Sequence, residues 1–304
     1  MCGLFGMAGV GVNSDDLDVI NDLMIVSALR GTDATGLVAG ATYGKAKCFK
    51  IKGDPYYWRW EAVAKGFEKP LFSISNSYFL GHCRKRTTGA TDVKGAQPFT
   101  GDKVIGTHNG MLSWDFDKFH TDSDKLIALI NANTDDFQSV IDQTNANDAI
   151  ALVWFNSKTG TLNLYKNNKR PLFFAFNEKR SVLYWASELE MLTLALKRNR
   201  VEFDAYFCQD NNHYSIKIGD INHKDKIEKL RAAVIRQPEP VTAKVIHIGG
   251  KGKHPKDNST VQGETLEELK QIPWMRDNIA PSTPWEGPDS FDEYDEEVRE
   301  RLLH

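Results

Sequence analysis

Short apolar segments separated by turn residues fill roughly the first two-thirds of the chain, a pattern that predicts many strands. Glycines recur in the first segment, residues 2–10, where they allow another backbone to approach closely. Further strands are expected at residues 36–43, 47–51, 77–84, 103–107, 149–155, 161–165, 172–176 and 182–186. The first two of these predict a hairpin and the last four an antiparallel meander. Asn109-Gly110 is expected to interrupt the strand that begins at Lys103.

Helical spacing of apolar residues predicts helices at three places. One runs from Ser14, a suitable N-cap, to about Arg30-Gly31, where glycine fits a helix end. The other two cover residues 123–130 and 187–197. The aromatic cluster at residues 56–60 predicts the start of a short helix that buries its rings.

The composition changes beyond about Gly219, where Pro, Lys, Asp and Glu dominate. We therefore predict a domain at residues 1–219 and a polar, partly disordered extension at residues 220–304. The glycine-lysine run at 249–253 lacks the ending of a phosphate loop and is interpreted as a flexible hinge. The acidic, aromatic stretch from Trp285 to Leu303 is either a solvated tail or a docking segment for a partner.

The charge and the cysteines exclude several classes of function. A net charge of −3 gives no bulk attraction to nucleic acid or to an anionic membrane, and no apolar run approaches the ~18 residues that span a bilayer. Cys48, Cys83 and Cys208 are scattered without paired spacing, which argues against disulfides and a zinc site. No signal peptide opens the chain, so we expect a cytoplasmic protein, and we expect no metal or cofactor.

Cys2 directly follows Met1, so removal of Met1 would make it the first residue. A first-residue cysteine has a nucleophilic thiol beside an α-amine that can act as the base, which is the chemistry of acyl transfer. Their unperturbed pKa values, ~8.5 and ~7.7–8.0, make proton exchange between them easy near neutral pH. The alternative is that Cys2 is only a small residue at the start of a buried strand.

Five short features follow one another along the chain: Cys2-Gly3-Leu4-Phe5-Gly6, the run 30–36 beginning Arg30-Gly31-Thr32-Asp33, the run 81–89 around Arg84, His108-Asn109-Gly110, and Thr121-Asp122-Ser123-Asp124. In this order they resemble the glutaminase domain of class-II glutamine amidotransferases, which are N-terminal-nucleophile (Ntn) hydrolases. The later run 167–188 resembles the end of that domain. The resemblance implies an α+β fold, a four-layer αββα sandwich with two antiparallel sheets.

The resemblance also implies a chemical role for the matching residues. Cys2 attacks the side-chain amide of L-glutamine. The side chain of Asn109 and the backbone N–H of Gly110 then stabilise the oxyanion, a contribution worth ~10²–10³ in rate for each donor. Arg30 supports the site beside Cys2.

Recognition of free glutamine requires a cation and an anion. By the same resemblance, Arg84 binds the carboxylate, Asp122 binds the ammonium and Thr87 adds a hydroxyl contact. Each residue also has a plainer interpretation, because a lone arginine is typical of the surface, a lone aspartate before a helix is typical of an N-cap, and Asn109-Gly110 is typical of a turn.

Two departures from the family pattern concern the lid that is expected over the site. Lys85 stands where many members have an aromatic residue, and Gly95-Ala96-Gln97-Pro98 stands where many have Asn-Ala-His-Pro. The nucleophile, the oxyanion hole and the carboxylate clamp are unaffected.

The sequence therefore predicts hydrolysis of L-glutamine to glutamate and ammonia through a thioester on Cys2. The part beyond Gly219 is too short and too polar for a synthase that consumes ammonia, so we expect the acceptor enzyme to be a separate polypeptide. One alternative is an Ntn amidohydrolase acting on another γ-glutamyl amide, which the surroundings of Lys85 and Gln97 motivate. Another is a catalytically silent glutamine-binding or scaffolding module, which retention of Met1 would favour.

Overall fold

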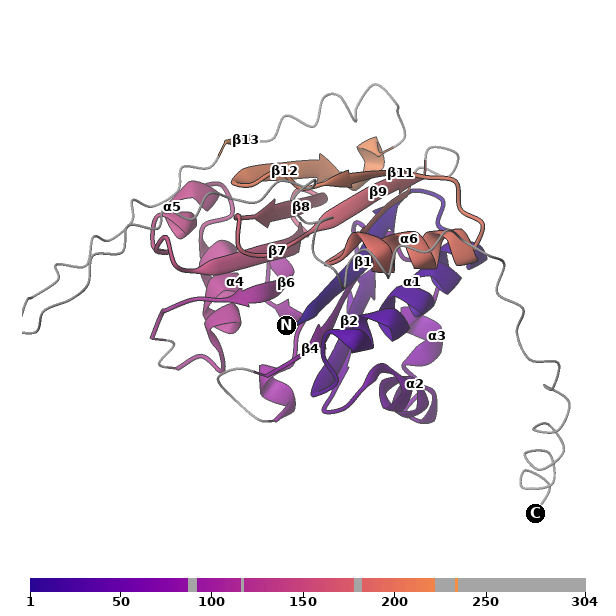
Figure 1. Cartoon of the computed structure of the whole chain (residues 1–304). Coiled ribbons are helices and arrows are strands. Elements are labelled where there is room, and N and C mark those ends of the chain that lie inside the picture. The colour runs from indigo at the N-terminus through magenta and orange to yellow at the C-terminus, as the bar shows by residue number, and fades with distance from the viewer. Residues whose placement is uncertain (87–91, 116–117, 178–181, 222–232, 235–304) are drawn as a thin grey trace, which may run out of the picture. The chain divides into compact units, whose positions relative to one another are not determined.

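Two antiparallel β-sheets form the centre of the computed structural model, which describes residues 1–86, 92–115, 118–177, 182–221 and 233–234 (Figure 1). The first sheet contains β1 (Gly3–Gly9), β2 (Ala34–Gly40), β3 (Lys47–Ile51), β4 (Tyr78–Arg84), β9 (Phe173–Asn177), β10 (Val182–Ala186) and β11 (Asp204–Phe207), in the order β11-β9-β10-β1-β4-β2-β3. The second contains β5 (Phe99–Thr100), β6 (Val104–Met111), β7 (Ala149–Asn156), β8 (Thr161–Lys166), β12 (Asn212–Lys217) and β13 (Ala233–Val234), in the order β13-β12-β8-β7-β6-β5.

Helices cover the outer face of each sheet, which gives four αββα layers (Figure 1). The first sheet carries α1 (Ser14–Val26), α2 (Pro55–Ala64), α3 (Glu68–Leu71) and α6 (Leu189–Arg198), and the second carries α4 (Asp122–Ala132) and α5 (Phe137–Ile141). Short 3₁₀ turns lie at Ser27–Leu29, Val93–Gly95 and Ile218–Asp220. The predicted α+β four-layer sandwich is therefore confirmed.

Most central strands are buried on both faces, which explains their continuous apolar runs. Successive side chains of a strand point to opposite faces, so Phe5 of β1 packs under the helices while Leu4 faces the second sheet. Tyr78 of β4 stacks on Phe155 of β7 with ring centroids 4.0 Å apart. The two sheets are thus in direct contact through a shared apolar core.

Helix α1 is confirmed, but the prediction of Ser14 as its N-cap is wrong. The side chain of Asn13 accepts from the N–H groups of Asp15 and Asp16 at 2.9 and 3.2 Å. Asp16 accepts in return from the N–H of Asn13 at 2.8 Å, completing a capping box. The reciprocal pair satisfies more of the free N–H groups at the helix start than a serine one position later could.

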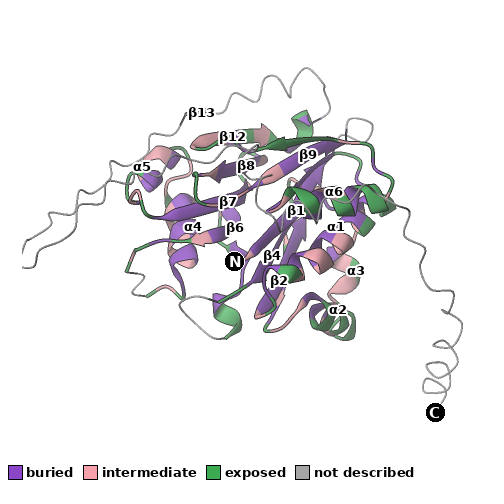
Figure 2. Cartoon of the chain, viewed as in Figure 1, coloured by how far each residue is buried: buried purple, intermediate pink, exposed green. Residues whose placement is uncertain are grey.

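Helix α2 is also confirmed, but the expectation that it buries its aromatic rings holds only for Trp58. Tyr56 and Trp60 are 66% and 65% exposed, and α2 is largely exposed in Figure 2. Residues four apart share one face of a helix, so these two rings lie together on the solvent side while Trp58 faces the core.

Two strand predictions are wrong. Strand β6 runs without interruption through Asn109 and Gly110, which pair with Ala151 and Ile150 of β7. The predicted meander is divided, because β7 and β8 lie in the second sheet whereas β9 and β10 lie in the first. Turn residues mark where strands end, but they carry no information on which of two packed sheets the next strand joins.

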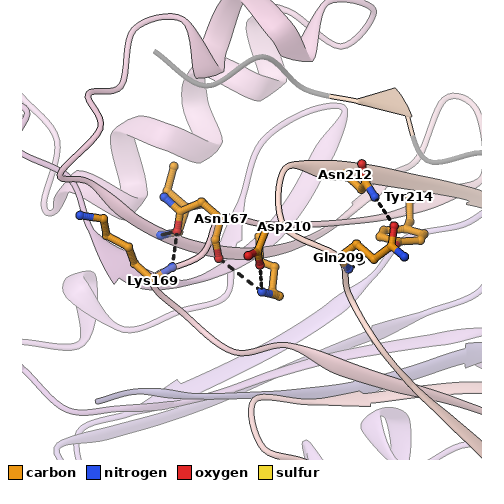
Figure 3. Close-up of polar contacts among 8 residues, drawn as sticks. Asn167, Lys169, Gln209, Asp210, Asn212 and Tyr214 are labelled. Carbon is orange, nitrogen blue, oxygen red and sulfur yellow. Dashed lines mark hydrogen bonds and ion pairs between the residues drawn. The ribbon is translucent and has the colours of Figure 1, made fainter. Parts of the chain in front are cut away.

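The turn before β12 is held against the end of β8 by polar contacts (Figure 3). Lys166 pairs with Asp210 and also accepts, through its carbonyl oxygen, from the N–H of Asn211 at 2.8 Å. Asn211 has a φ of 62°, a left-handed conformation that asparagine tolerates. β12 thereby pairs with β8 along the edge of the second sheet.

The boundary predicted at residue 219 stays a prediction. Most of the predicted extension, including the glycine-lysine run at 249–253 and the stretch from Trp285 to Leu303, lies outside the described residues.

Candidate active site

Cys2 lies immediately before β1, between the ends of β4 and β6. Its backbone N–H donates to Oδ1 of Asn109 at 3.3 Å. Its Sγ accepts from the backbone N–H of Lys85 at 3.3 Å, and its carbonyl oxygen accepts from Nε of Arg30 at 2.6 Å. Three segments that are far apart in the sequence therefore hold Cys2, two through its backbone and one through its thiol.

The loop after α1 is shaped to support Cys2. Arg30 is buried and also pairs with Glu188, which precedes α6. Gly31 lies so close to the end of β4 that a Cβ on it would fall 2.3 Å from the carbonyl carbon of Arg84. Asp33 completes the contact, because its N–H donates to the carbonyl of Arg84 at 2.9 Å and its Oδ2 accepts from the N–H of Arg86 at 2.8 Å.

Asn109 and Gly110 lie beside Cys2. The side chain of Asn109 is 2% exposed, and its buried Nδ2 has no hydrogen-bond partner among the described residues, whereas its Oδ1 is occupied by Cys2. A Cβ on Gly110 would fall 1.8 Å from the carbonyl oxygen of Ala149, so no other residue fits here. A buried amide donor that is unused by the protein is available to a ligand.

One polar pocket contains four of the predicted site residues. It is lined by Cys2, Arg84, Gly110 and Asp122, together with Lys85, Gln97, His108 and Thr121. Asn109 and Arg30 contact Cys2 but do not line this pocket, and Thr87 lies outside the described residues.

Asp122 is the first residue of α4, whose N-cap is Thr121 rather than Asp122. Its Oδ2 accepts from the N–H of Leu112 at 2.8 Å, and its Oδ1 accepts from the N–H of Ser123 at 2.8 Å. These two backbone donors fix a carboxylate that is 7% exposed at the pocket wall.

Burial dominates the electrostatics of the pocket. It raises the pKa of the Cys2 thiol, and the Lys85 N–H, the N-terminal charge, Arg84 and Arg30 oppose that rise. Burial also lowers the pKa of Arg84, which the Cys2 thiolate would oppose. The thiol is thus held in its protonated form, so a base is needed to make it a nucleophile.

His108 and Ser123, which the sequence did not indicate as site residues, also line the pocket. Nε2 of His108 lies 3.3 Å from the carbonyl oxygen of Ala149, and Nδ1 lies 2.9 Å from Oγ of Ser123. A carbonyl only accepts, so this geometry assigns the proton to Nε2 and makes Nδ1 the acceptor. Burial lowers the pKa of His108, which keeps the ring neutral. Both residues stand in the quoted runs, but nothing in the runs showed that they touch.

No protein-family model matches the chain. Over 112 residues the chain is 34% identical to the glutamine–fructose-6-phosphate aminotransferase (isomerizing) of Caulobacter vibrioides, a match that covers 37% of this chain and 17% of that protein. Two solved structures share the fold with a TM-score of 0.53: the glutamine phosphoribosylpyrophosphate amidotransferase of B. subtilis, at 19% identity, and a protein described as the allosteric regulatory enzyme of purine biosynthesis, at 17% identity. Each match covers 72% of this chain and 48% of the other, so the chain spans about half the length of these structures.

The sequence match and the shared fold together confirm the predicted resemblance to the glutaminase domain of class-II glutamine amidotransferases, with its Ntn-hydrolase sandwich. Within the described part of the chain, no helix is both long and apolar enough to cross a membrane. The same residues include no group of three or more His, Cys, Asp or Glu side chains that could hold a metal ion.

Proposed function

We propose that the chain, after removal of Met1, hydrolyses L-glutamine to glutamate and ammonia through a thioester on Cys2. The observation that carries the proposal is the position of Cys2, whose N–H contacts Asn109 while its thiol lines the pocket that contains Arg84 and Asp122. A nucleophile, an unused amide donor, a cation and an anion are what hydrolysis of a zwitterionic amide requires.

The first half of the reaction forms the acyl-enzyme. The α-amine of Cys2 takes the thiol proton, and Sγ attacks the side-chain amide carbon of glutamine. The amide oxygen becomes an oxyanion, which accepts from Nδ2 of Asn109 and from the N–H of Gly110. The protonated α-amine then gives its proton to the departing nitrogen, so ammonia leaves and a γ-glutamyl thioester remains.

The second half releases glutamate. A water molecule gives a proton to the α-amine and attacks the thioester carbon, and the same two donors hold the new oxyanion. The carbon–sulfur bond breaks, and the proton returns to the thiolate. Cys2 is thereby regenerated with both its thiol and its free amine.

Arg84 and Asp122 select glutamine at its α-carbon end. Arg84 offers a guanidinium to the carboxylate, and Asp122 offers a carboxylate to the ammonium. The position of Asp122 is set by the Leu112 and Ser123 N–H groups, so it is fixed before the ligand arrives. Thr87 is proposed to add its hydroxyl to this contact.

The ammonia is proposed to pass to a synthase on a separate polypeptide. The names of the similar proteins pair glutamine with a second substrate, fructose-6-phosphate or phosphoribosylpyrophosphate. The stretch from Trp285 to Leu303 is the proposed docking segment, because aromatic residues dominate interface hot spots. A chain ending near Ala280 should lose a partner that full-length protein retains in a pull-down from its native cell. Identical partners for the full-length and the shortened chain would overturn this docking proposal.

Ammonia release from purified protein tests the function. Intact mass first establishes that Met1 is absent, and L-glutamine is then compared with γ-glutamyl amides. Cys2→Ala should abolish release, while Cys48→Ser, at another half-buried free cysteine, should retain it. Preference for another γ-glutamyl amide would make that amide the substrate in place of glutamine. Failure to hydrolyse any of them after Met1 removal would contradict the proposal.

A further inference from the structure

Gln97 replaces a strand partner at the edge of β6. Its Oε1 accepts from the backbone N–H of His108 at 2.6 Å, and its Nε2 donates to the carbonyl oxygen of His108 at 2.8 Å. Strand β5 covers this edge only as far as Gly106, which pairs with Phe99. The Gln97 amide therefore continues the ladder by one more hydrogen-bonded position, from Gly106 to His108, the residue that precedes Asn109.

The Gln97 segment is itself fixed by the first sheet. Its carbonyl oxygen would lie 2.0 Å from a Cβ on Gly36 of β2, so the two backbones are in close contact. Nζ of Lys50 on β3 donates to the carbonyl oxygen of Ala96 at 2.9 Å. Gln97 is 5% exposed. It thus connects β6 to the sheet that carries Cys2.

The next N–H on the same edge is that of Gly110. Alternate residues of a strand direct their N–H groups to the same side, so those of His108 and Gly110 share one edge of β6, and Leu112 directly follows the strand. The N–H of His108 is bound by Gln97, and the N–H of Leu112 is bound by Asp122. The Gly110 donor lies between two backbone positions that side chains hold in place.

We propose that Gln97 is a positioning residue that sets the direction of the Gly110 N–H and of the Asn109 side chain toward the oxyanion. The proposal rests on the proposed glutaminase function. Gln97 acts through the backbone of His108, while Asp122 holds the other side of the same donor. A peptide-like amide is suited to this because it satisfies an N–H and a carbonyl at once.

Two substitutions and one control test this in the full-length, Met1-processed chain. Gln97→Met keeps the length of the side chain and removes both hydrogen bonds. Gln97→Glu keeps the acceptor for the His108 N–H and places a second oxygen against the His108 carbonyl. The matched control is Asn131→Leu, because Oδ1 of Asn131 holds the opposite end of the same strand by accepting from Lys103 and Val104 at 2.9 and 3.0 Å.

Misdirected oxyanion donors slow chemistry more than they weaken binding. We expect both Gln97 variants to lower kcat about 10- to 100-fold, somewhat less than deletion of a donor, with KM changed less than about threefold. Alkylation of Cys2 by iodoacetamide needs no oxyanion hole and should keep its rate. Asn131→Leu should lower the unfolding temperature without a comparable loss of kcat.

The outcomes separate this inference from the function itself. If the wild-type protein hydrolyses glutamine, an unchanged kcat in both Gln97 variants would overturn the positioning role. A loss of kcat no larger than that of Asn131→Leu would do the same. A wild-type protein without ammonia release would remove the function. Hydrogen exchange at residues 108–110 would then decide whether Gln97 holds the edge, since Gln97→Met should accelerate exchange there and equal rates would overturn it.

Discussion

Nε of Arg30 lies 2.6 Å from the carbonyl oxygen of Cys2, and the same guanidinium pairs with Glu188. The contact joins the segment after α1 to the residue that immediately precedes β1. It fixes the backbone of the residue whose thiol faces the pocket, and Arg30 itself is absent from the pocket wall. Cys2 is therefore held by a charged side chain that does not line the pocket.

Loss of this support should slow catalysis without changing substrate recognition. Arg30→Met removes the bond to the Cys2 carbonyl and leaves Glu188 unpaired, so Cys2 can move from its attacking position. We expect kcat to fall about 10- to 100-fold, because a displacement near 1 Å costs about that much, while KM changes little. Steady-state kinetics with glutamine measure this, with Lys65→Met, in a surface pair with Glu61, as the control. Equal loss in both variants would contradict the role of Arg30.

Substitution of Asn109 separates its two hydrogen-bonding functions. Asn109→Asp keeps an acceptor for the N–H of Cys2, removes the Nδ2 donor and adds a negative charge near the developing oxyanion. We expect kcat to fall at least ~10²–10³-fold, the cost of one oxyanion donor. Single-turnover kinetics should show the loss in thioester formation. A variant that forms the thioester at the wild-type rate would exclude Asn109 from the oxyanion hole.

Arg84 should act on the carboxylate of the substrate and on nothing else in it. Arg84→Met should raise KM for glutamine about 10- to 100-fold, since charge-assisted hydrogen bonds contribute about 1.5–3 kcal/mol. The comparison substrate is glutaminamide, which lacks the carboxylate. Wild type and variant should differ little with it, and an equal loss for both substrates would mean that Arg84 serves the nucleophile instead.

Acid should destabilise the fold through His82. This residue is fully buried in β4, and burial lowers the pKa of its imidazole from 6.5 to about 3. The unfolded chain binds a proton below about pH 6.5 while the folded chain does not, so stability is complete above that pH and is lost as the pH falls toward 3. We expect His82 to account for about 2 kcal/mol of lost unfolding free energy at pH 5. Urea unfolding of wild type and His82→Leu between pH 7 and 5 tests this, with the exposed His120→Leu as control. Parallel pH profiles for wild type and His82→Leu would contradict it.

The sequence indicated which residues meet in one pocket, but not which contacts hold them there. Cys2, Arg84, Gly110 and Asp122 stand in short runs whose order resembles a known family, and the structure brings them to one pocket. The two hydrogen bonds from Gln97 to the backbone of His108 could not be predicted. A side chain that bonds to a backbone places no requirement on the type of residue that it holds. Only the departure at Gln97 from the family pattern marked the position.

The fold was predicted in its layers but not in its local detail. Apolar runs between turn residues identified most strands, and apolar spacing identified most helices, because burial imposes those patterns on the sequence. The continuous strand through Asn109 and Gly110 was missed, since the pair is typical of a turn when no neighbouring strand is known. Here β7 provides that neighbour, and pairing with Ala151 and Ile150 overrides the local preference.

The most direct test of the account is to trap the acyl-enzyme. Processed protein is mixed with L-glutamine, quenched in acid during turnover and digested, and every cysteine peptide is examined by mass spectrometry. We expect a γ-glutamyl adduct on Cys2 alone, and the Cys2→Ala variant should show neither the adduct nor ammonia release. Ammonia release that survives in Cys2→Ala, or an adduct on Cys48, Cys83 or Cys208 instead of Cys2, would contradict the central claim.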